Sequence, residues 1–248
     1  RFQAPLWMSM TDFLMAKWLS SKEGGMAIGS VSGGGGSADH FFRHGLKSPE
    51  DLAKVRARSD YYSNLVPAVP MRFHRIQDQD IIPIGGRNWR AISGFGHSPE
   101  HMSLACEEIK VMITGDMLLP RISTNVSVYD GEPDADPLGL FLGSLKKYSD
   151  LDPMTLILPS HGKPFQGMHF RIQELEKHHE DRLAETYQAC AQPKTAREIV
   201  PVLFKRELDI HQLTFAMGET IAHLNYLMKR GKLKRISGSD GTLRFLQS

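Results

Sequence analysis

Short runs of hydrophobic residues bounded by Gly, Pro and Asn predict a chain rich in β-strands in its first two thirds. The dipeptide Gly85-Gly86 separates two of these runs and predicts a hairpin. Two later runs, MSLAC and VMIT, are continuous and favour buried strands. The predicted strands are residues 4–8, 72–76, 80–84, 88–92, 102–106, 111–114 and 155–158.

Helical spacing of apolar residues predicts helices between and after these strands. The clearest start is Ser48-Pro49-Glu50-Asp51, which combines an N-cap serine, a proline in the first turn and acids that favour the helix dipole. A long apolar stripe predicts another helix over residues 169–190. The remaining predicted helices are residues 11–18, 137–148, 195–204 and 213–230, and the helix that begins at Ser48 extends to about residue 64.

This mixture predicts an α/β (α+β) protein with two domains. A chain of 248 residues with 41% apolar content can bury a full core. Ala191-Gln192-Pro193 interrupts the helical pattern, so we place a large domain at residues 1–190 and a small one at residues 191–248.

The composition excludes some classes of protein. No run of about 18 apolar residues is present, so no transmembrane helix or membrane partner is expected. Cys106 and Cys190 lie far apart without a Cys-x-x-Cys pair, which favours a reducing, cytoplasmic location. The chain opens on Arg1 without an initiating methionine or a signal peptide, so we expect it to be a fragment.

Three polar residues directly follow predicted strands. His97 stands in a Gly-flanked turn, Asp116 comes just past the strand VMIT, and His161 lies in the turn Pro-Ser-His-Gly. Strand ends are where a rigid scaffold presents functional side chains. Imidazole and carboxylate groups suit zinc or a similar divalent ion, so these residues are candidate metal ligands.

Other polar residues leave two interpretations open. Residues 118–137 form a long segment without periodicity, which favours a pocket wall, and Arg121 within it either binds a substrate anion or pairs with a surface acid. His40 and His44 stand four residues apart, as a metal pair on a helix does, although such a pair is more often polar helix surface.

Together, three segments resemble the later metal motifs of the metallo-β-lactamase superfamily. They are Gly96-His97-Ser98-Pro99-Glu100-His101-Met102, Thr114-Gly115-Asp116 and Pro159-Ser160-His161-Gly162, with 19 and 45 positions between the candidate ligands. The resemblance covers roughly residues 1–190. It implies an αββα sandwich, here N-terminally incomplete.

The resemblance also implies a metal site and a reaction. His97 would bind the first of two divalent ions, His161 the second, and Asp116 would bridge both; His101 would orient the loop without binding metal. The ions expected are zinc, with iron or manganese as alternatives. Two metals about 3.5–4 Å apart can generate hydroxide at neutral pH and polarise a carbonyl or phosphoryl oxygen, so hydrolysis is the implied chemistry.

The chain departs from the family in one respect. The superfamily cluster His-x-His-x-Asp-His is absent, and we expect it to precede Arg1 together with the opening strands. Without it, each metal keeps one terminal ligand and a share of Asp116, fewer than the three protein ligands of a catalytic zinc. We therefore expect this chain to be weakly active or inactive, and the full-length parent to be an active hydrolase.

The last segment is basic and predicts helices followed by a β-hairpin, which resembles a winged helix. Residues 191–248 carry ten Lys and Arg against five Asp and Glu, while the whole chain has a net charge of only +2. Lys232, Lys234 and Arg235 are candidate contacts to nucleic-acid phosphates. A structural or dimerising role, giving a homodimer, is the alternative.

Three functions remain open from the sequence. The first is a metal-dependent hydrolase of a small thioester, lactone or related ester. The second is a metal-dependent endoribonuclease whose winged helix binds single-stranded RNA, and the third is a non-enzymatic winged-helix binding protein. The substrate, the metal and the oligomeric state are not determined by the sequence.

Overall fold

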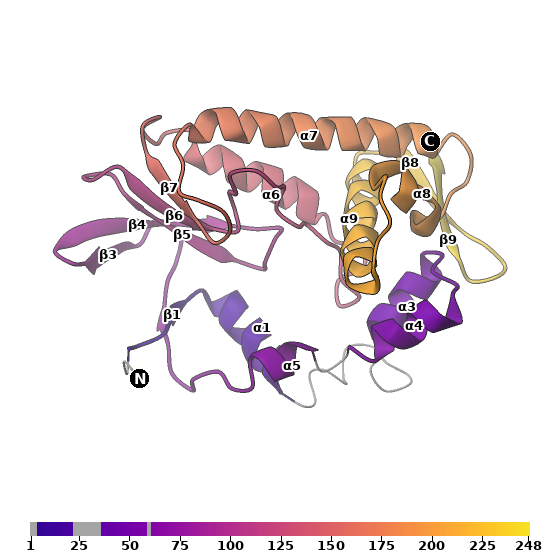
Figure 1. Cartoon of the computed structure of the whole chain (residues 1–248), viewed down its shortest axis with the longest axis horizontal. Helices are drawn as coiled ribbons and strands as arrows, with labels where there is room; N and C mark the ends of the chain where they lie inside the picture. Colours follow the sequence, from indigo (N-terminus) through magenta and orange to yellow (C-terminus); the bar gives the residue numbers. More distant parts are fainter. Residues whose placement is uncertain (1–3, 22–35, 59–60) are drawn as a thin grey trace. The chain divides into compact units, whose positions relative to one another are not determined.

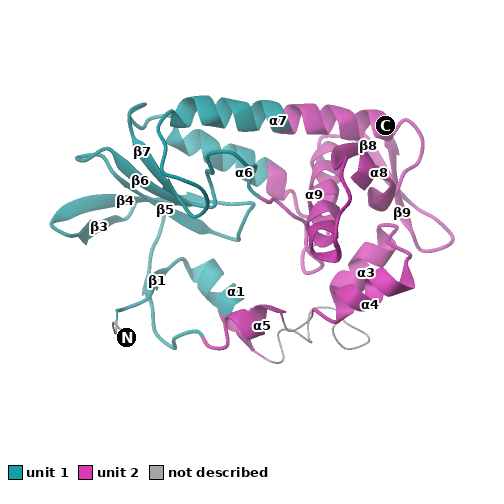
Figure 2. Ribbon diagram, viewed as in Figure 1, with its two compact units in different colours: residues 1–16, 69–124, 139–178 teal, residues 17–68, 125–138, 179–248 magenta. Residues whose placement is uncertain are grey.

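A computed structural model describes residues 4–21, 36–58 and 61–248 (Figure 1). These residues form two compact units that interleave along the chain (Figure 2). The first unit takes in residues 1–16, 69–124 and 139–178, and the second residues 17–68, 125–138 and 179–248. The boundaries of these units fall at other positions of the chain. The division into domains at residue 190 stays a prediction.

The first unit is built on a five-stranded sheet with the order β3-β4-β5-β6-β7. Successive strands from β3 to β6 pair antiparallel, and β7 runs parallel to β6. Gly85 and Gly86 both have positive φ, as the predicted two-residue hairpin between β3 and β4 requires. The strands are β3 Ile81–Ile84, β4 Arg87–Gly94, β5 His101–Cys106, β6 Val111–Gly115 and β7 Leu156–Pro159.

A second, two-stranded sheet is shorter than predicted. The predicted strands 4–8 and 72–76 reduce to β1 Trp7–Met8 and β2 His74–Arg75, which pair in parallel. The carbonyls of Leu6 and Met8 accept cross-strand hydrogen bonds from the amides of His74 and Ile76. A strand extends only as far as its neighbour pairs with it, and the pairing here covers two residues of each strand.

Helices α1, α6 and α7 contribute residues to the first unit, and a short 3₁₀ helix follows α6. Within this unit, Phe141, Leu145 and Tyr148 are fully buried with strand residues such as Met112 and Ile157. The buried Tyr148 hydroxyl has a hydrogen-bond partner there, the Ser103 hydroxyl of β5 at 2.9 Å. The bounds are α1 Met10–Ser20, α6 Pro137–Leu145, the 3₁₀ helix Lys146–Tyr148 and α7 Met168–Ala189.

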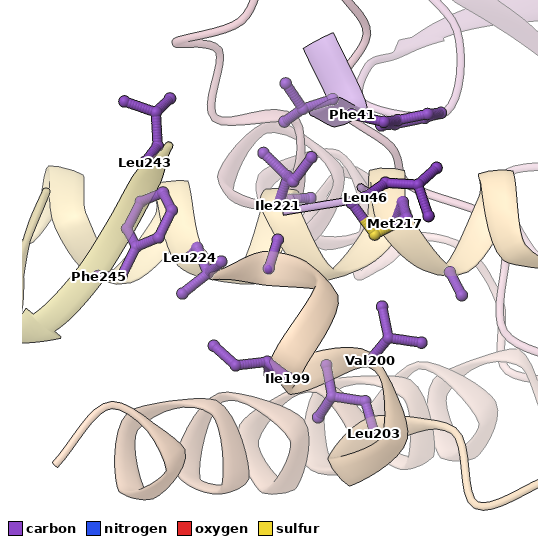
Figure 3. Packing of buried hydrophobic residues seen from close by; sticks show 14 of the residues in the cluster. Phe41, Leu46, Ile199, Val200, Leu203, Met217, Ile221, Leu224, Leu243 and Phe245 are labelled. Carbon is purple, nitrogen blue, oxygen red and sulfur yellow. The ribbon is translucent and has the colours of Figure 1, made fainter. Parts of the chain in front are cut away.

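The second unit is mainly helical and ends in a two-stranded hairpin. Its core joins residues from α3, α8, α9 and β9, with Phe41, Ile199, Met217, Ile221 and Phe245 among them (Figure 3). The predicted order of helix, helix and hairpin for the last segment is the order observed. The bounds are α3 Gly36–Arg43, α4 Pro49–Arg56, α5 Tyr61–Leu65, α8 Ala196–Leu203, α9 Ile210–Lys229, β8 Leu233–Ser237 and β9 Leu243–Gln247.

Two helix predictions in this unit have different outcomes. Ser48 caps α4 as predicted, since its hydroxyl accepts a hydrogen bond from the Asp51 amide. The single helix predicted from there to residue 64 was wrong, because α4 ends at Arg56 and α5 begins at Tyr61. Past the end of α4, the Arg58 guanidinium contacts the imidazole of His211 at 2.7 Å.

Two expectations from the composition can be compared with the described residues. Cys106 and Cys190 are both buried and free. Within residues 4–21, 36–58 and 61–248, no helix has the length and apolar content needed to cross a membrane.

Candidate metal centre

The ends of two parallel strands bring Asp116 and His161 to one edge of the sheet. β6 and β7 are in register up to Gly115 and Pro159, with an irregularity just before Gly115. The Ser160 amide then donates a hydrogen bond to the Gly115 carbonyl at 3.0 Å. The residues that follow the two strands therefore lie close together, as the sequence analysis expected.

Asp116 lies between two histidines. Its Oδ2 atom is 3.5 Å from Nε2 of His97, and its Oδ1 atom is 3.5 Å from Nε2 of His161. The side chains of His97 and Asp116 are 27% and 28% exposed, while that of His161 is 69% exposed. Each carboxylate oxygen thus faces a different imidazole nitrogen, and all three groups can be reached by a small solute.

The loop that carries His97 is held on both sides. Before His97, the Phe95 amide donates a hydrogen bond to the Ser144 hydroxyl of α6 at 2.9 Å. After it, the Asp12 carboxylate of α1 accepts hydrogen bonds from the Glu100 amide at 3.0 Å and the Ser98 hydroxyl at 3.2 Å. Two helices therefore fix the ends of the turn at whose tip His97 stands.

Asp12 is free for this role because another residue caps α1. The sequence pattern predicts that this helix begins at Thr11-Asp12. In the structure α1 begins at Met10, and the Ser9 hydroxyl accepts the hydrogen bond from the Asp12 amide at 3.2 Å. Sequence patterns alone did not reveal the roles of Asp12 and Ser144; the only signal was an acid in the first turn of a helix.

His101 lies against the backbone of Gly115, next to the candidate ligands. A Cβ atom at Gly115 would overlap the His101 ring, and Gly115 also has a positive φ of 54°. Burial, and then the nearby His97, lower the pKa of His101. Its Nδ1 atom is buried without a hydrogen-bond partner in the described residues. The metal-orienting role expected for His101 stays a prediction.

The chemistry of the donor set fits divalent metal ions. Two imidazole nitrogens and a carboxylate with one oxygen towards each are the ligand types that zinc and related ions take. In the described part of the chain, however, no group of three or more His, Cys, Asp or Glu side chains is arranged to hold a metal by itself. Within the described residues these three side chains therefore do not form a complete metal site, and the upstream His-x-His-x-Asp-His cluster stays a prediction.

The other predicted site residues are scattered. Arg121 is exposed and, among the described residues, has no hydrogen bond or ion pair. Lys232 is exposed in the turn before β8 and Lys234 is exposed on β8 itself. Arg235 is paired with Asp134 at 2.6 Å. Nothing in this arrangement assigns them a ligand.

His40 and His44 differ from the prediction in their burial. Polar helix surface was the favoured interpretation, and it was wrong: His40 is 7% exposed and His44 is 1% exposed. Phe41 and Leu46 nearby belong to the core of the second unit, and burial of these apolar neighbours draws both imidazoles inward.

Comparisons with known proteins identify the family of the chain. The family model described as "Metallo-beta-lactamase superfamily" matches residues 35–161, and the model described as "Metallo-beta-lactamase-like, C-terminal domain" matches residues 183–248. A crystal structure of a beta-lactamase domain protein from Burkholderia ambifaria is 48% identical. The match has a TM-score of 0.90 and covers 100% of this chain and 67% of that chain.

Two curated proteins are also similar. One is a probable metallo-hydrolase, YqjP, of Bacillus subtilis strain 168, 29% identical over 58% of this chain and 46% of its own length. The other is the atrochrysone carboxyl ACP thioesterase AacuM of Aspergillus aculeatus, 30% identical over 40% of this chain and 28% of its own length. The match thus spans less than half the length of either relative. With a family model that covers more than half of the chain, and a sheet that brings its motif residues together, the chain belongs to the metallo-beta-lactamase superfamily.

Proposed function

We propose that the protein is a metal-dependent hydrolase of a small thioester, lactone or related ester. The observation that carries the proposal is the position of Asp116, whose two carboxylate oxygens each lie 3.5 Å from the Nε2 atom of a different histidine. A carboxylate placed in this way can bridge two ions. The thioesterase among the similar proteins supports an acyl substrate.

The residues of this chain would divide the work of holding the ions. His97 would bind one, His161 the other, and Asp116 both, with the remaining ligands from the expected upstream cluster. When bound, two divalent ions supply Lewis-acid polarisation of a carbonyl and lower the pKa of water. Zinc is the first choice on ligand type, with iron and manganese as alternatives.

The protein around the ions contributes orientation. The hydrogen bonds that Asp12 and Ser144 accept from the Glu100 and Phe95 amides hold the His97 loop, so this imidazole need not be ordered when a metal binds. The exposed guanidinium of Arg121 would bind the carboxylate or phosphate of a substrate's acyl carrier, a contact suited to its planar fork.

The test compares metal content and turnover. A form of the protein extended upstream to include the expected cluster should hold two metals per chain and hydrolyse a short acyl thioester or a lactone. Asp116→Ala in that form should lower turnover about 100-fold or more by removing the bridge. His74→Ala, which changes an exposed histidine of β2, serves as the matched control. Unchanged turnover in Asp116→Ala would refute the assignment.

The two other functions expected from the sequence have weaker support. The three arginines at the C-terminal hairpin and just before it, Arg230, Arg235 and Arg244, are paired with Asp136, Asp134 and Asp240 at 2.7, 2.6 and 3.0 Å. Paired arginines release few counterions on binding a polyanion. Single-stranded RNA binding, a winged-helix role for residues 191–248 and a homodimer stay predictions.

RNA binding can be tested directly. We expect titration with single-stranded RNA at low salt to give weak binding, with little change when Lys232 and Lys234 are replaced by Gln. Tight binding that falls steeply with salt and is lost in this double variant would instead favour the ribonuclease. Hydrolysis of a phosphodiester in preference to a thioester would point the same way.

A further inference from the structure

The wall of a small cavity in the second unit contains His40 of α3 and His44, the residue after the end of that helix. It has a volume of about 110 Å³ and is lined by His40, Arg43, His44, Pro133, Asp134, Arg235 and Leu243. All of these residues belong to the second unit, and none is part of the candidate metal centre around Asp116. The cavity is therefore a separate feature that the proposed hydrolase chemistry does not use.

The hydrogen bond made by His44 determines which of its nitrogens is free. Its Nδ1 atom lies 2.9 Å from the carbonyl oxygen of His40, which can only accept a hydrogen bond. Nδ1 therefore carries the proton, and Nε2 of the neutral ring holds an unprotonated lone pair. A histidine whose second nitrogen is held by a backbone carbonyl is oriented as metal-ligating histidines are.

His40 offers a second imidazole at the same place. Its ring centroid is 4.5 Å from that of His44, and the two residues have the i, i+4 spacing used by metal-binding histidine pairs on helices. The Nε2 atoms of both rings are buried without a hydrogen-bond partner in the described residues. Buried polar atoms are rarely left without a partner, so this pair calls for an ion or water to complete it.

Both rings are neutral at physiological pH. Burial lowers the pKa of His40 to about 3, with repulsion from His44 as a second cause. Burial also lowers the pKa of His44 to about 4. Protons therefore do not compete for the two lone pairs at neutral pH.

The charged groups around the cavity are one carboxylate and two guanidinium groups. Asp134 supplies a carboxylate that is paired with Arg235 at 2.6 Å, and Arg43 is exposed on the last turn of α3. The arginines weaken the binding of a cation by Coulomb repulsion, while the buried imidazoles favour it. Release of Asp134 from its exposed pair with Arg235 costs little, because such pairs contribute little to stability.

We propose that His40 and His44 form a second metal site, in which their Nε2 atoms bind one divalent transition metal such as Zn²⁺ and the Asp134 carboxylate offsets one of its two positive charges. In the described residues no three His, Cys, Asp or Glu side chains are grouped to hold a metal. Water therefore completes the coordination, and the metal exchanges more readily than at a site with three protein ligands.

The test removes the other candidate ligands first. In a full chain carrying His97→Ala, Asp116→Ala and His161→Ala, Zn²⁺ is titrated in competition with a chromophoric chelator. We expect one Zn²⁺ per chain, and a loss of affinity of at least about tenfold when His44→Gln or His40→Gln is added. His74→Gln in the same background is the control for an exposed histidine and should leave the affinity unchanged.

Two further measurements keep the test decisive if a buried histidine cannot be replaced without unfolding. X-ray absorption at the zinc edge of the background variant should show scattering from two imidazoles, and scattering from oxygen alone would overturn the proposal. Inorganic phosphate that raises the melting temperature while Zn²⁺ leaves it unchanged would assign the cavity to an anion instead. No Zn²⁺ binding in the background variant would also overturn it.

Discussion

Among single residues, Glu219 stands out because its burial disfavours the charged form of its carboxylate. It lies half-buried in α9, between the buried residues Gly218 and Thr220. Burial raises the pKa of Glu219 to about 7, although the positive charge of Arg182 acts in the opposite direction. The folded protein therefore holds a proton at pH values where the unfolded chain has released it.

This residue predicts a pH dependence of stability. Because the pKa is higher in the folded state, the stabilising contribution is complete below about pH 4.5 and is lost as the pH rises to about 7. Glu219→Gln should remove this dependence and raise the free energy of unfolding at pH 8 by about 1–3 kcal/mol relative to the parent. Urea unfolding of both proteins at pH 5 and pH 8 measures it, and equal differences at the two pH values would contradict it.

Gly115 gives a second prediction at this scale. Its positive φ and the nearby ring of His101 leave no room for a side chain. Gly115→Ala should displace His101 and the adjacent Asp116, and so weaken metal binding at the candidate centre about tenfold or more. Gly143→Ala, at a glycine with open space around its Cβ position, is the control. Equal metal affinity in the two variants would show that His101 can move aside at no cost.

The positions of individual residues could be predicted where the residue type and a strand end indicate a function. They could not be predicted where burial depends on packing between distant segments. The candidate ligands His97, Asp116 and His161 follow strand ends, and the structure brings them together. The burial of His40 and His44 had no local signal, because it depends on apolar residues that join the core from distant parts of the sequence.

At the scale of elements, the candidate centre depends on helix ends that hold loops. α1 uses Asp12 to hold the turn after His97, and its first-turn position places the carboxylate beside the Glu100 amide. Thr11 adds a hydrogen bond to the Glu100 carboxylate at 2.8 Å. A helix outside the sheet therefore controls the geometry of the loop that carries the candidate ligand His97.

Loss of the hydrogen bond between the Asp12 carboxylate and the Glu100 amide should lower metal affinity more than it lowers the stability of the fold. Asp12→Ala in the extended protein is expected to lower metal affinity about tenfold, and Asp12→Asn, which keeps one acceptor oxygen, should recover part of the loss. Asp51→Asn is the control, because it also neutralises an acid in the first turn of a helix, α4, and so removes the same kind of helix-dipole stabilisation as Asp12→Asn. Metal titration and thermal melting are compared for all three. A loss of stability without a loss of affinity would contradict a positioning role.

The cap of α8 makes a separate prediction. The Thr195 hydroxyl accepts a hydrogen bond from the Glu198 amide at 3.3 Å, and the Glu198 carboxylate accepts one from the Thr195 amide at 2.8 Å. This capping box satisfies amides that the helix leaves without partners. Thr195→Ala should destabilise the protein by about 1 kcal/mol, while Thr195→Ser keeps the hydroxyl and should cost less. Chemical denaturation of the two variants decides this, and equal losses would exclude the cap as the cause.

Elements with a strong local signal were predicted closely. Ser48 and Thr195 both cap helices as expected, and the Gly85-Gly86 turn is observed. Strand lengths were less accurate at β1 and β2, since a strand extends only as far as its neighbour pairs with it, and pairing is not local information.

At the scale of the whole molecule, the order of segments along the chain differs from their grouping in space. Each compact unit draws on three separate stretches of sequence. The division predicted at residue 190 stays a prediction, and the Pro-containing break in periodicity behind it carries no information on which distant segments share a core. The core around Ile221 accordingly includes Phe41 and Val128, which lie far from it in sequence.

This grouping predicts how a shortened chain will behave. Residues 191–248 alone would expose the apolar surface that Phe41, Leu46, Leu52 and Val128 cover in the complete unit. We expect the isolated segment to lack a cooperative thermal transition, while the complete chain shows one. Circular dichroism on heating compares them. A sharp transition in the short segment would show that it is an independent domain.

The shared core of the second unit also limits how this protein can be rearranged by recombination. Genes for modular proteins exchange domains as continuous pieces, and an exchanged piece functions only if it brings its whole core with it. Here α3 and α4 complete the core of α8 and α9 from the other end of the sequence. The C-terminal segment is therefore expected to be inherited together with residues 36–56, and to change in step with them.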